Sequence, residues 1–127
     1  MRKRTIAAFL LAALAAAGTT YLRTSMPAAE VVRKLAGMRV ALTLYRLEHK
    51  RFPGSFGDVV ASGQLEAVPD LKLSGHLRYA AVRQAGSFEL KDTGGWAYVN
   101  DPGHPQFGLL YIDCSHKDEK GRFWSEF

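Results

Sequence analysis

The distribution of apolar residues divides the first fifty positions into two helical stretches of different character. Residues Ile6–Leu22 are almost entirely apolar, which is typical of a helix that lies in lipid or among other helices. Residues Ala28–His49 instead place apolar side chains at alternating steps of four and three, so that they share one helical face. This stripe consists of Val31, Leu35, Met38, Leu42 and Tyr45, and we expect Val32, Ala41, Leu44 and Leu47 to widen it. A sheet or further helices must cover such a face.

The pattern changes to short β-type segments in the second half of the chain. Four segments separated by turns rich in glycine and proline are expected to be strands: Leu77–Arg83, Ser87–Lys91, Trp96–Asn100 and Phe107–Asp113. The first two are expected to form a hairpin. The sequence therefore predicts an α+β fold with a long N-terminal helix packed on a four-stranded antiparallel sheet. The aromatic pair Phe123–Trp124 is expected to fold back onto that sheet and hold the tail.

Three basic residues, Arg2, Lys3 and Arg4, precede the apolar run, as in export signals and membrane anchors. Residues 1–27 are therefore interpreted as a basic leader with an anchor or signal segment, and residues 28–127 as the folded domain. As an anchor, Ile6–Leu22 supplies about 26 Å of helix against roughly 30 Å of hydrocarbon. As a signal peptide, it offers small side chains for cleavage after Ala17. The hydropathy of this segment does not distinguish a membrane anchor from a cleaved signal peptide.

The formal net charge of +5 suggests nucleic-acid binding only until its distribution is considered. Once the three basic residues of the leader are set aside, 14 basic side chains remain against 12 acidic ones. They form no basic stripe interleaved with aromatic residues, so we predict no nucleic-acid partner. Cys114 is the one cysteine, which excludes an intrachain disulfide. Its expected role is that of a small buried side chain.

Several potential metal ligands gather in the last quarter of the sequence: Asp101, His104, Asp113, Cys114, His116 and Asp118. Their spacing matches no known zinc, metalloprotease or EF-hand motif, so no transition-metal site is predicted. A calcium ion held by Asp113, Asp118 and nearby carbonyls is less unreasonable than a transition metal, because calcium accepts irregular oxygen ligands. A dyad of Cys114 with His104 or His116 is conceivable, but no nucleophile–base motif supports it. We therefore predict no catalytic residues and no cofactor.

The order of these segments along the chain is similar to that in a known protein family. A basic leader, an apolar helix, a proline and an amphipathic helix ending in LYRLEHKRFP (44–53) are followed by GGWAY (94–98) and KDEKGRFWSEF (117–127). This order resembles the type IV pilin and type II secretion pseudopilin family over nearly the whole chain, and the last two segments look like those of major pseudopilins. The resemblance implies an apolar helix that anchors the subunit in the bacterial inner membrane. It also implies that this helix packs with other pilin-like subunits, and that the folded domain lies in the periplasm.

The N-terminus departs from the prepilin signature of that family at two positions. Counted back from Pro27, Thr5 stands where a glycine precedes the cleavage point, and Leu10 stands where the family has a glutamate. We expect a non-enzymatic structural subunit of a pilus or secretion pseudopilus, with a single membrane-spanning helix. The alternatives are a soluble periplasmic binding module released by signal cleavage, and a small secreted or tethered enzyme.

Overall fold

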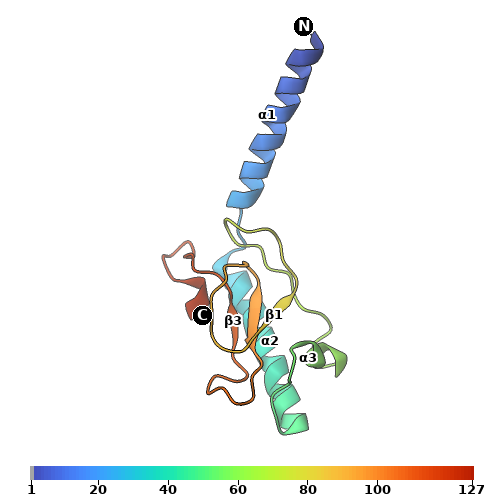
Figure 1. Cartoon of the computed structure of the whole chain (residues 1–127), viewed down its shortest axis with the longest axis vertical. Coiled ribbons are helices and arrows are strands. Elements are labelled where there is room, and N and C mark those ends of the chain that lie inside the picture. Colours follow the sequence, from blue (N-terminus) through green and yellow to red (C-terminus); the bar gives the residue numbers. More distant parts are fainter. Residues whose placement is uncertain (1) are drawn as a thin grey trace.

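The computed structural model describes residues 2–127, and it shows a projecting helix followed by an α+β domain (Figure 1). Helix α1 (Arg2–Arg23) extends away from the domain and has no buried residue. Its C-terminal end is tied to the loop that precedes the sheet. The Gly75 amide donates to the Leu22 carbonyl at 2.6 Å, and the Arg78 amide donates to the Tyr21 hydroxyl at 3.1 Å.

Helix α2 (Ala28–His49) begins directly after Pro27, whose φ of −58° suits the entry to a helix. The predicted five-residue stripe is confirmed, since Val31, Leu35, Met38, Leu42 and Tyr45 are all buried. The predicted widening of the stripe is correct for Ala41 and wrong for the other three residues. Exposed fractions of 37% for Val32, 48% for Leu44 and 61% for Leu47 place these on the outer side, because the narrow sheet covers only one strip of the helix.

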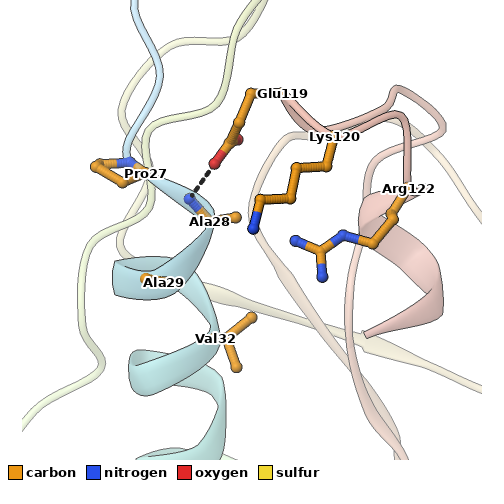
Figure 2. Close-up of a pocket in the computed structure, with 7 residues that line it drawn as sticks. All are labelled: Pro27, Ala28, Ala29, Val32, Glu119, Lys120 and Arg122. Atoms are coloured by element: carbon orange, nitrogen blue, oxygen red, sulfur yellow. Dashed lines mark hydrogen bonds between the residues drawn. The ribbon is translucent and has the colours of Figure 1, made fainter.

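The first amide of α2 is capped from the opposite end of the chain. Glu119 accepts a hydrogen bond from the Ala28 amide at 3.2 Å, which places a carboxylate at the positive end of the helix (Figure 2). Figure 2 also shows the side chains of Lys120 and Arg122 on the loop side of the adjoining pocket. The C-terminal loop is therefore packed against the start of α2.

The sheet differs from the prediction. It has three strands among residues 2–127, β1 (Val82–Ala85), β2 (Trp96–Val99) and β3 (Leu110–Ile112), in the order β1-β2-β3. Strands β2 and β3 are antiparallel, with Trp96 opposite Ile112, but β1 and β2 are parallel, with Val82 opposite Trp96. The predicted arrangement of four antiparallel strands, and the hairpin within it, are not present.

The segment predicted as the second strand, Ser87–Lys91, crosses the sheet without joining it. Its backbone groups bond to side chains instead of to a neighbouring strand: the Glu89 amide and carbonyl meet the Tyr111 hydroxyl at 3.2 and 2.8 Å, and the Lys91 amide donates to Asp113 at 2.7 Å. These side chains form the hydrogen bonds that the backbone groups of this segment would otherwise make with a neighbouring strand. The connection is therefore a crossover, and β2 returns parallel to β1.

Both faces of the central strand are buried, and this explains its uninterrupted apolar character. One face of β2 carries Trp96 and Tyr98, which pack with the stripe of α2. The same core includes Val59 of the short helix α3 (Gly57–Ala61). The other face carries Ala97 and Val99 and is covered partly by Leu90 from the crossover segment. Strands covered on both sides lose the alternation of polar and apolar residues.

The C-terminal tail folds back as expected for one residue of the predicted pair, Phe123 and Trp124. Trp124, in the short helix η1 (Trp124–Glu126), is 2% exposed and joins the core beside α2. Phe123 is 39% exposed, so the prediction is wrong for that ring. The chain end is held by Arg39 of α2, whose guanidinium donates to the Phe127 carbonyl at 2.7 Å and to the Leu110 carbonyl at 2.9 Å.

Candidate metal centre

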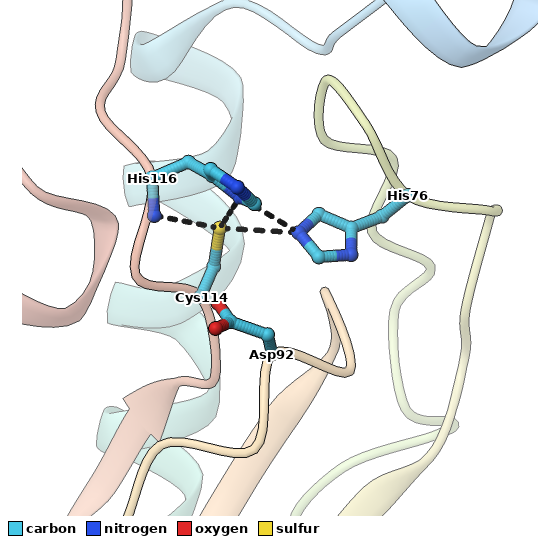
Figure 3. A group of neighbouring side chains, drawn as sticks. All are labelled: His76, Asp92, Cys114 and His116. Carbon is cyan, nitrogen blue, oxygen red and sulfur yellow. Dashed lines mark hydrogen bonds between the residues drawn. The ribbon is translucent and has the colours of Figure 1, made fainter.

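Three segments that are distant in the sequence bring four potential metal ligands together at one end of the sheet (Figure 3). His76 comes from the loop before β1, Asp92 from the crossover before β2, and Cys114 and His116 from the chain just after β3. One ligand atom from each residue lies within 4.8 Å of all the others. This is the one such group of histidine, cysteine and carboxylate side chains within residues 2–127.

The sulfur and two imidazole nitrogens form a nearly equilateral triangle. His76 Nε2 lies 3.2 Å from His116 Nδ1, and Cys114 Sγ lies 3.3 Å from the former and 3.4 Å from the latter. Figure 3 shows both rings directed toward the sulfur. With hydrogens on the opposite ring nitrogens, each of these atoms can direct a lone pair into the triangle.

The His76 side chain is placed by a small hairpin and by two glycines. Leu71 and Tyr79 pair through backbone hydrogen bonds of 2.8 and 2.9 Å, which leaves His76 near the tip of the intervening loop. The loop lies directly against the start of β2, because Gly94 has no side chain. A Cβ on Gly94 would stand 2.3 Å from His76 Cγ, and one on Gly95 would stand 2.2 Å from the Tyr79 ring. Gly94 therefore makes room for His76, and Gly95 makes room for Tyr79 of the same hairpin.

Cys114 and His116 are positioned by the end of β3 and by the folded tail. Cys114 is fully buried two residues after the end of β3, and its sulfur also accepts the His116 amide at 3.4 Å. The His116 carbonyl accepts the Trp124 amide at 3.1 Å. The buried indole of the tail thus holds the backbone from which His116 reaches the sulfur.

Asp92 is held in an unusual backbone conformation on the exposed side of the group. Its φ of 52° lies in the left-handed region, which is costly for residues other than glycine and less so for aspartate. Its carboxylate accepts hydrogen bonds from the Ser115 amide at 2.5 Å and from the Ser115 hydroxyl at 2.9 Å. These bonds hold the pKa of Asp92 below its usual value, so the carboxylate is charged at neutral pH.

The electrostatic setting favours neutral imidazole and disfavours a free thiolate. Burial, followed by the proximity of His116, lowers the pKa of His76, so that the ring is unprotonated and able to act as a ligand. Burial raises the pKa of the Cys114 thiol, which is the opposite of what an activated nucleophile requires. A thiol, two imidazoles and a carboxylate form a donor set that suits zinc. Asp92 and His116 are exposed, so an ion can reach the group from solution.

The two residues predicted as calcium ligands are engaged elsewhere. Asp113 is buried, and its carboxylate accepts from Arg83 Nε at 3.1 Å, the Thr93 hydroxyl at 2.7 Å and the Lys91 amide at 2.7 Å. Asp118 accepts from the Arg122 amide and Nε, both at 2.8 Å, among other donors. Each carboxylate already has a cationic partner, and the absence of a metal at this pair stays the prediction, with calcium as the alternative.

Asp101 and His104, the remaining two sequence candidates, lie in the turn between β2 and β3 and make only local contacts there. Asp101 accepts the Gly103 amide at 2.9 Å, and His104 Nδ1 accepts the Gln106 amide at 3.1 Å. Cys114 and His116 are candidates by their place in the sequence, whereas nothing in the sequence near His76 or Asp92 predicts a role in this site. The one local signal was the Cys-x-His pair, which by itself matches no established metal motif.

No known family model, curated protein or solved structure matches this chain. Helix α1 is long and apolar enough to cross a membrane, and a signal sequence near an N-terminus would have the same length and composition.

Proposed function

We propose that this chain is a non-enzymatic, pilin-like structural subunit of a type IV pilus or type II secretion pseudopilus. In this proposal α1 anchors the subunit in the bacterial inner membrane, and residues 28–127 form its periplasmic domain. The observation that carries the proposal is the contrast between the two long helices. The apolar face of α2 is covered by the sheet, whereas α1 has no buried residue at all.

The surface of α1 requires an apolar environment outside the domain. Phe9 is 73% exposed, Leu14 is 69% exposed and Leu11 is 67% exposed. Large continuous apolar surfaces of this kind mark membrane or protein contacts in stable proteins. The apolar part of α1, residues 6–22, spans about 26 Å, slightly less than the roughly 30 Å of a bilayer core. The basic residues Arg2, Lys3 and Arg4, at the start of α1, favour a cytoplasmic N-terminus.

The polar groups within α1 are compatible with lipid. Thr19 and Thr20 donate their hydroxyl hydrogens to the carbonyls of Ala15 and Ala16, at 2.8 and 2.9 Å. Both hydroxyls are thereby satisfied inside the helix, which removes most of the cost of placing them in hydrocarbon. The alanine-rich sequence around Gly18 also presents small side chains, which allow close helix–helix packing in membranes. Contacts with other subunits through α1 are therefore part of the proposal.

Anchoring is tested by fractionation of the cells that make the protein. We expect the full-length chain to remain in the membrane after alkaline carbonate extraction, with residues 24–127 accessible to protease from the periplasmic side. The alternative function, a soluble periplasmic binding module, requires cleavage near Ala17. A mature protein that lacks residues 1–17 by mass and stays soluble would support that alternative and overturn the anchor.

Subunit packing through α1 is tested by oxidative cross-linking of a cysteine placed in the helix. Leu14→Cys is expected to give cross-linked oligomers in membranes, because the side chain faces outward. Glu66→Cys, on the exposed surface of the folded domain, is the matched control and is expected to stay monomeric. The native Cys114 is buried and is retained in both variants. Equal cross-linking of the two variants would contradict packing through the helix.

A further inference from the structure

We propose that His76, Cys114 and His116, completed by Asp92, bind one zinc ion that fastens the C-terminal segment to the loop before β1. This site is independent of the proposed membrane anchor, because none of its residues belongs to α1. The inference rests on the geometry of the triangle, the completeness of the donor set and the way in which the surrounding chain holds each ligand.

The triangle has the size that a tetrahedral zinc ion requires. Bond lengths of about 2.05 Å to nitrogen and about 2.3 Å to sulfur give ligand separations of about 3.3 Å for N···N and about 3.6 Å for N···S. The measured separations are 3.2 Å between His76 and His116, and 3.3 and 3.4 Å from these nitrogens to the Cys114 sulfur. All three agree with the tetrahedral separations to within about 0.3 Å.

Asp92 provides the fourth ligand from the exposed side. Its nearest carboxylate oxygen lies within 4.8 Å of each of the three other ligand atoms, so a modest shift of the side chain completes the tetrahedron. The Ser115 amide and hydroxyl bond to different oxygens of the carboxylate, and one of these bonds can be kept while the other oxygen meets the ion. Outer hydrogen bonds of this kind commonly orient metal-binding carboxylates.

The donor set selects zinc among the common biological cations. Calcium and magnesium bind oxygen ligands and have little affinity for a thiolate or imidazole. Mixed sulfur and nitrogen donors at tetrahedral separations are typical of zinc. Because four protein ligands leave no open position, the ion would be structural and not catalytic. Loss of the Cys114 proton on binding would be compensated by the charge of the ion.

The position of the site explains what such an ion would do. The three strands are only three or four residues long, and the segments beyond them are mostly irregular. His76 belongs to the loop that also contacts the end of α1 through Gly75, while His116 is joined to the tail through Trp124. A zinc ion would connect the loop, the crossover and the tail at a single point. Metal binding in such small domains contributes directly to folding stability.

The experiment uses the full-length chain in detergent micelles, stripped with a chelator and then loaded with zinc or cobalt. We expect one equivalent of zinc by elemental analysis after removal of excess metal. We expect the cobalt form to show a thiolate-to-cobalt charge-transfer band and the strong visible absorption of tetrahedral cobalt. Absence of bound metal, or an octahedral cobalt spectrum without the charge-transfer band, would overturn the proposal.

Variants assign the ligands. Cys114→Ser should abolish the charge-transfer band, and His116→Gln should weaken zinc binding at least about tenfold. His116 is exposed, so this variant keeps the test valid if the buried Cys114→Ser protein fails to fold. His104→Gln is the matched control, because His104 lies outside the group. Zinc should raise the thermal midpoint of the parent and of His104→Gln clearly more than that of His116→Gln. The same shift in all three proteins would mean adventitious binding to surface histidines and would overturn the site.

Discussion

The replacement of Asp113 by asparagine probes the junction on which the sheet and the candidate metal centre both depend. The Asp113 side chain is fully buried at the end of β3 and forms an ion pair with Arg83 of β1 at 3.1 Å. It also accepts hydrogen bonds from Thr93 and from the Lys91 amide, so one carboxylate joins three segments. Asparagine has almost the same shape but no charge, and its amide group places two donors where acceptors are needed.

The expected cost follows from the charge that is left behind. Removing one partner of a buried ion pair typically costs about 3–5 kcal/mol, because the other charge stays desolvated. The side chain of Arg83 is 18% exposed, so solvent relieves part of this penalty. Arg83 also keeps its bond to the Glu89 carbonyl. We therefore expect Asp113→Asn to lower the free energy of unfolding by about 3 kcal/mol, near the lower limit of that range.

The assay is denaturant unfolding of the full-length chain in detergent micelles, with chelator present so that metal binding does not contribute. Asp101→Asn is the matched control, because this exposed carboxylate accepts only a local turn amide at 2.9 Å, and a change within about 0.5 kcal/mol is expected. A loss below about 0.5 kcal/mol for Asp113→Asn would refute the assignment of Asp113 as a buried junction.

The same carboxylate makes a prediction about pH. Burial alone would raise the pKa of Asp113, but hydrogen bonds from Arg83, Thr93 and the Lys91 amide outweigh it and hold the pKa below its usual value. A group whose pKa is lower in the folded state contributes stability above its unfolded pKa of about 4. That contribution is lost as the pH falls through the lower folded pKa. The stability difference between the parent and Asp113→Asn should therefore shrink below about pH 4.

Five further substitutions test the core, the tail and the anchor. Leu42→Ala should lower the free energy of unfolding by about 2–5 kcal/mol, because Leu42 is 3% exposed. Leu47→Ala, on the outer face, should lower it by less than about 0.5 kcal/mol. Equal losses in denaturant unfolding would contradict the assigned face of α2. Trp124→Ala should cost about 3–5 kcal/mol and Phe123→Ala clearly less, and a Trp124→Ala chain as stable as its parent would show that the tail does not dock. Leu10→Lys should shift the chain out of carbonate-washed membranes, because a central lysine costs about 2.5–3.5 kcal/mol on insertion; unchanged retention would argue against a spanning α1.

The helices could be predicted from the sequence because their signals are local. The steps of four and three between Val31 and Tyr45 define one face of a helix regardless of what covers it, and α2 occupies the expected residues. The proline after the apolar run likewise marks the break between α1 and α2. The width of the buried face could not be obtained in this way, since the exposure of Leu44 and Leu47 depends on how far the sheet extends.

The tertiary structure alone decided the strand order and the candidate metal centre. Whether Ser87–Lys91 pairs as a strand or crosses the sheet depends on Tyr111 and Asp113, side chains more than twenty positions away that accept and donate the competing hydrogen bonds. The ligands His76 and Cys114 are 38 residues apart and meet only because Gly94 lets the loop lie against β2. The spacing of apolar residues along the chain predicts which residues of one helix or strand are buried together. A site of this kind depends instead on the distances between segments that come together only when the chain packs.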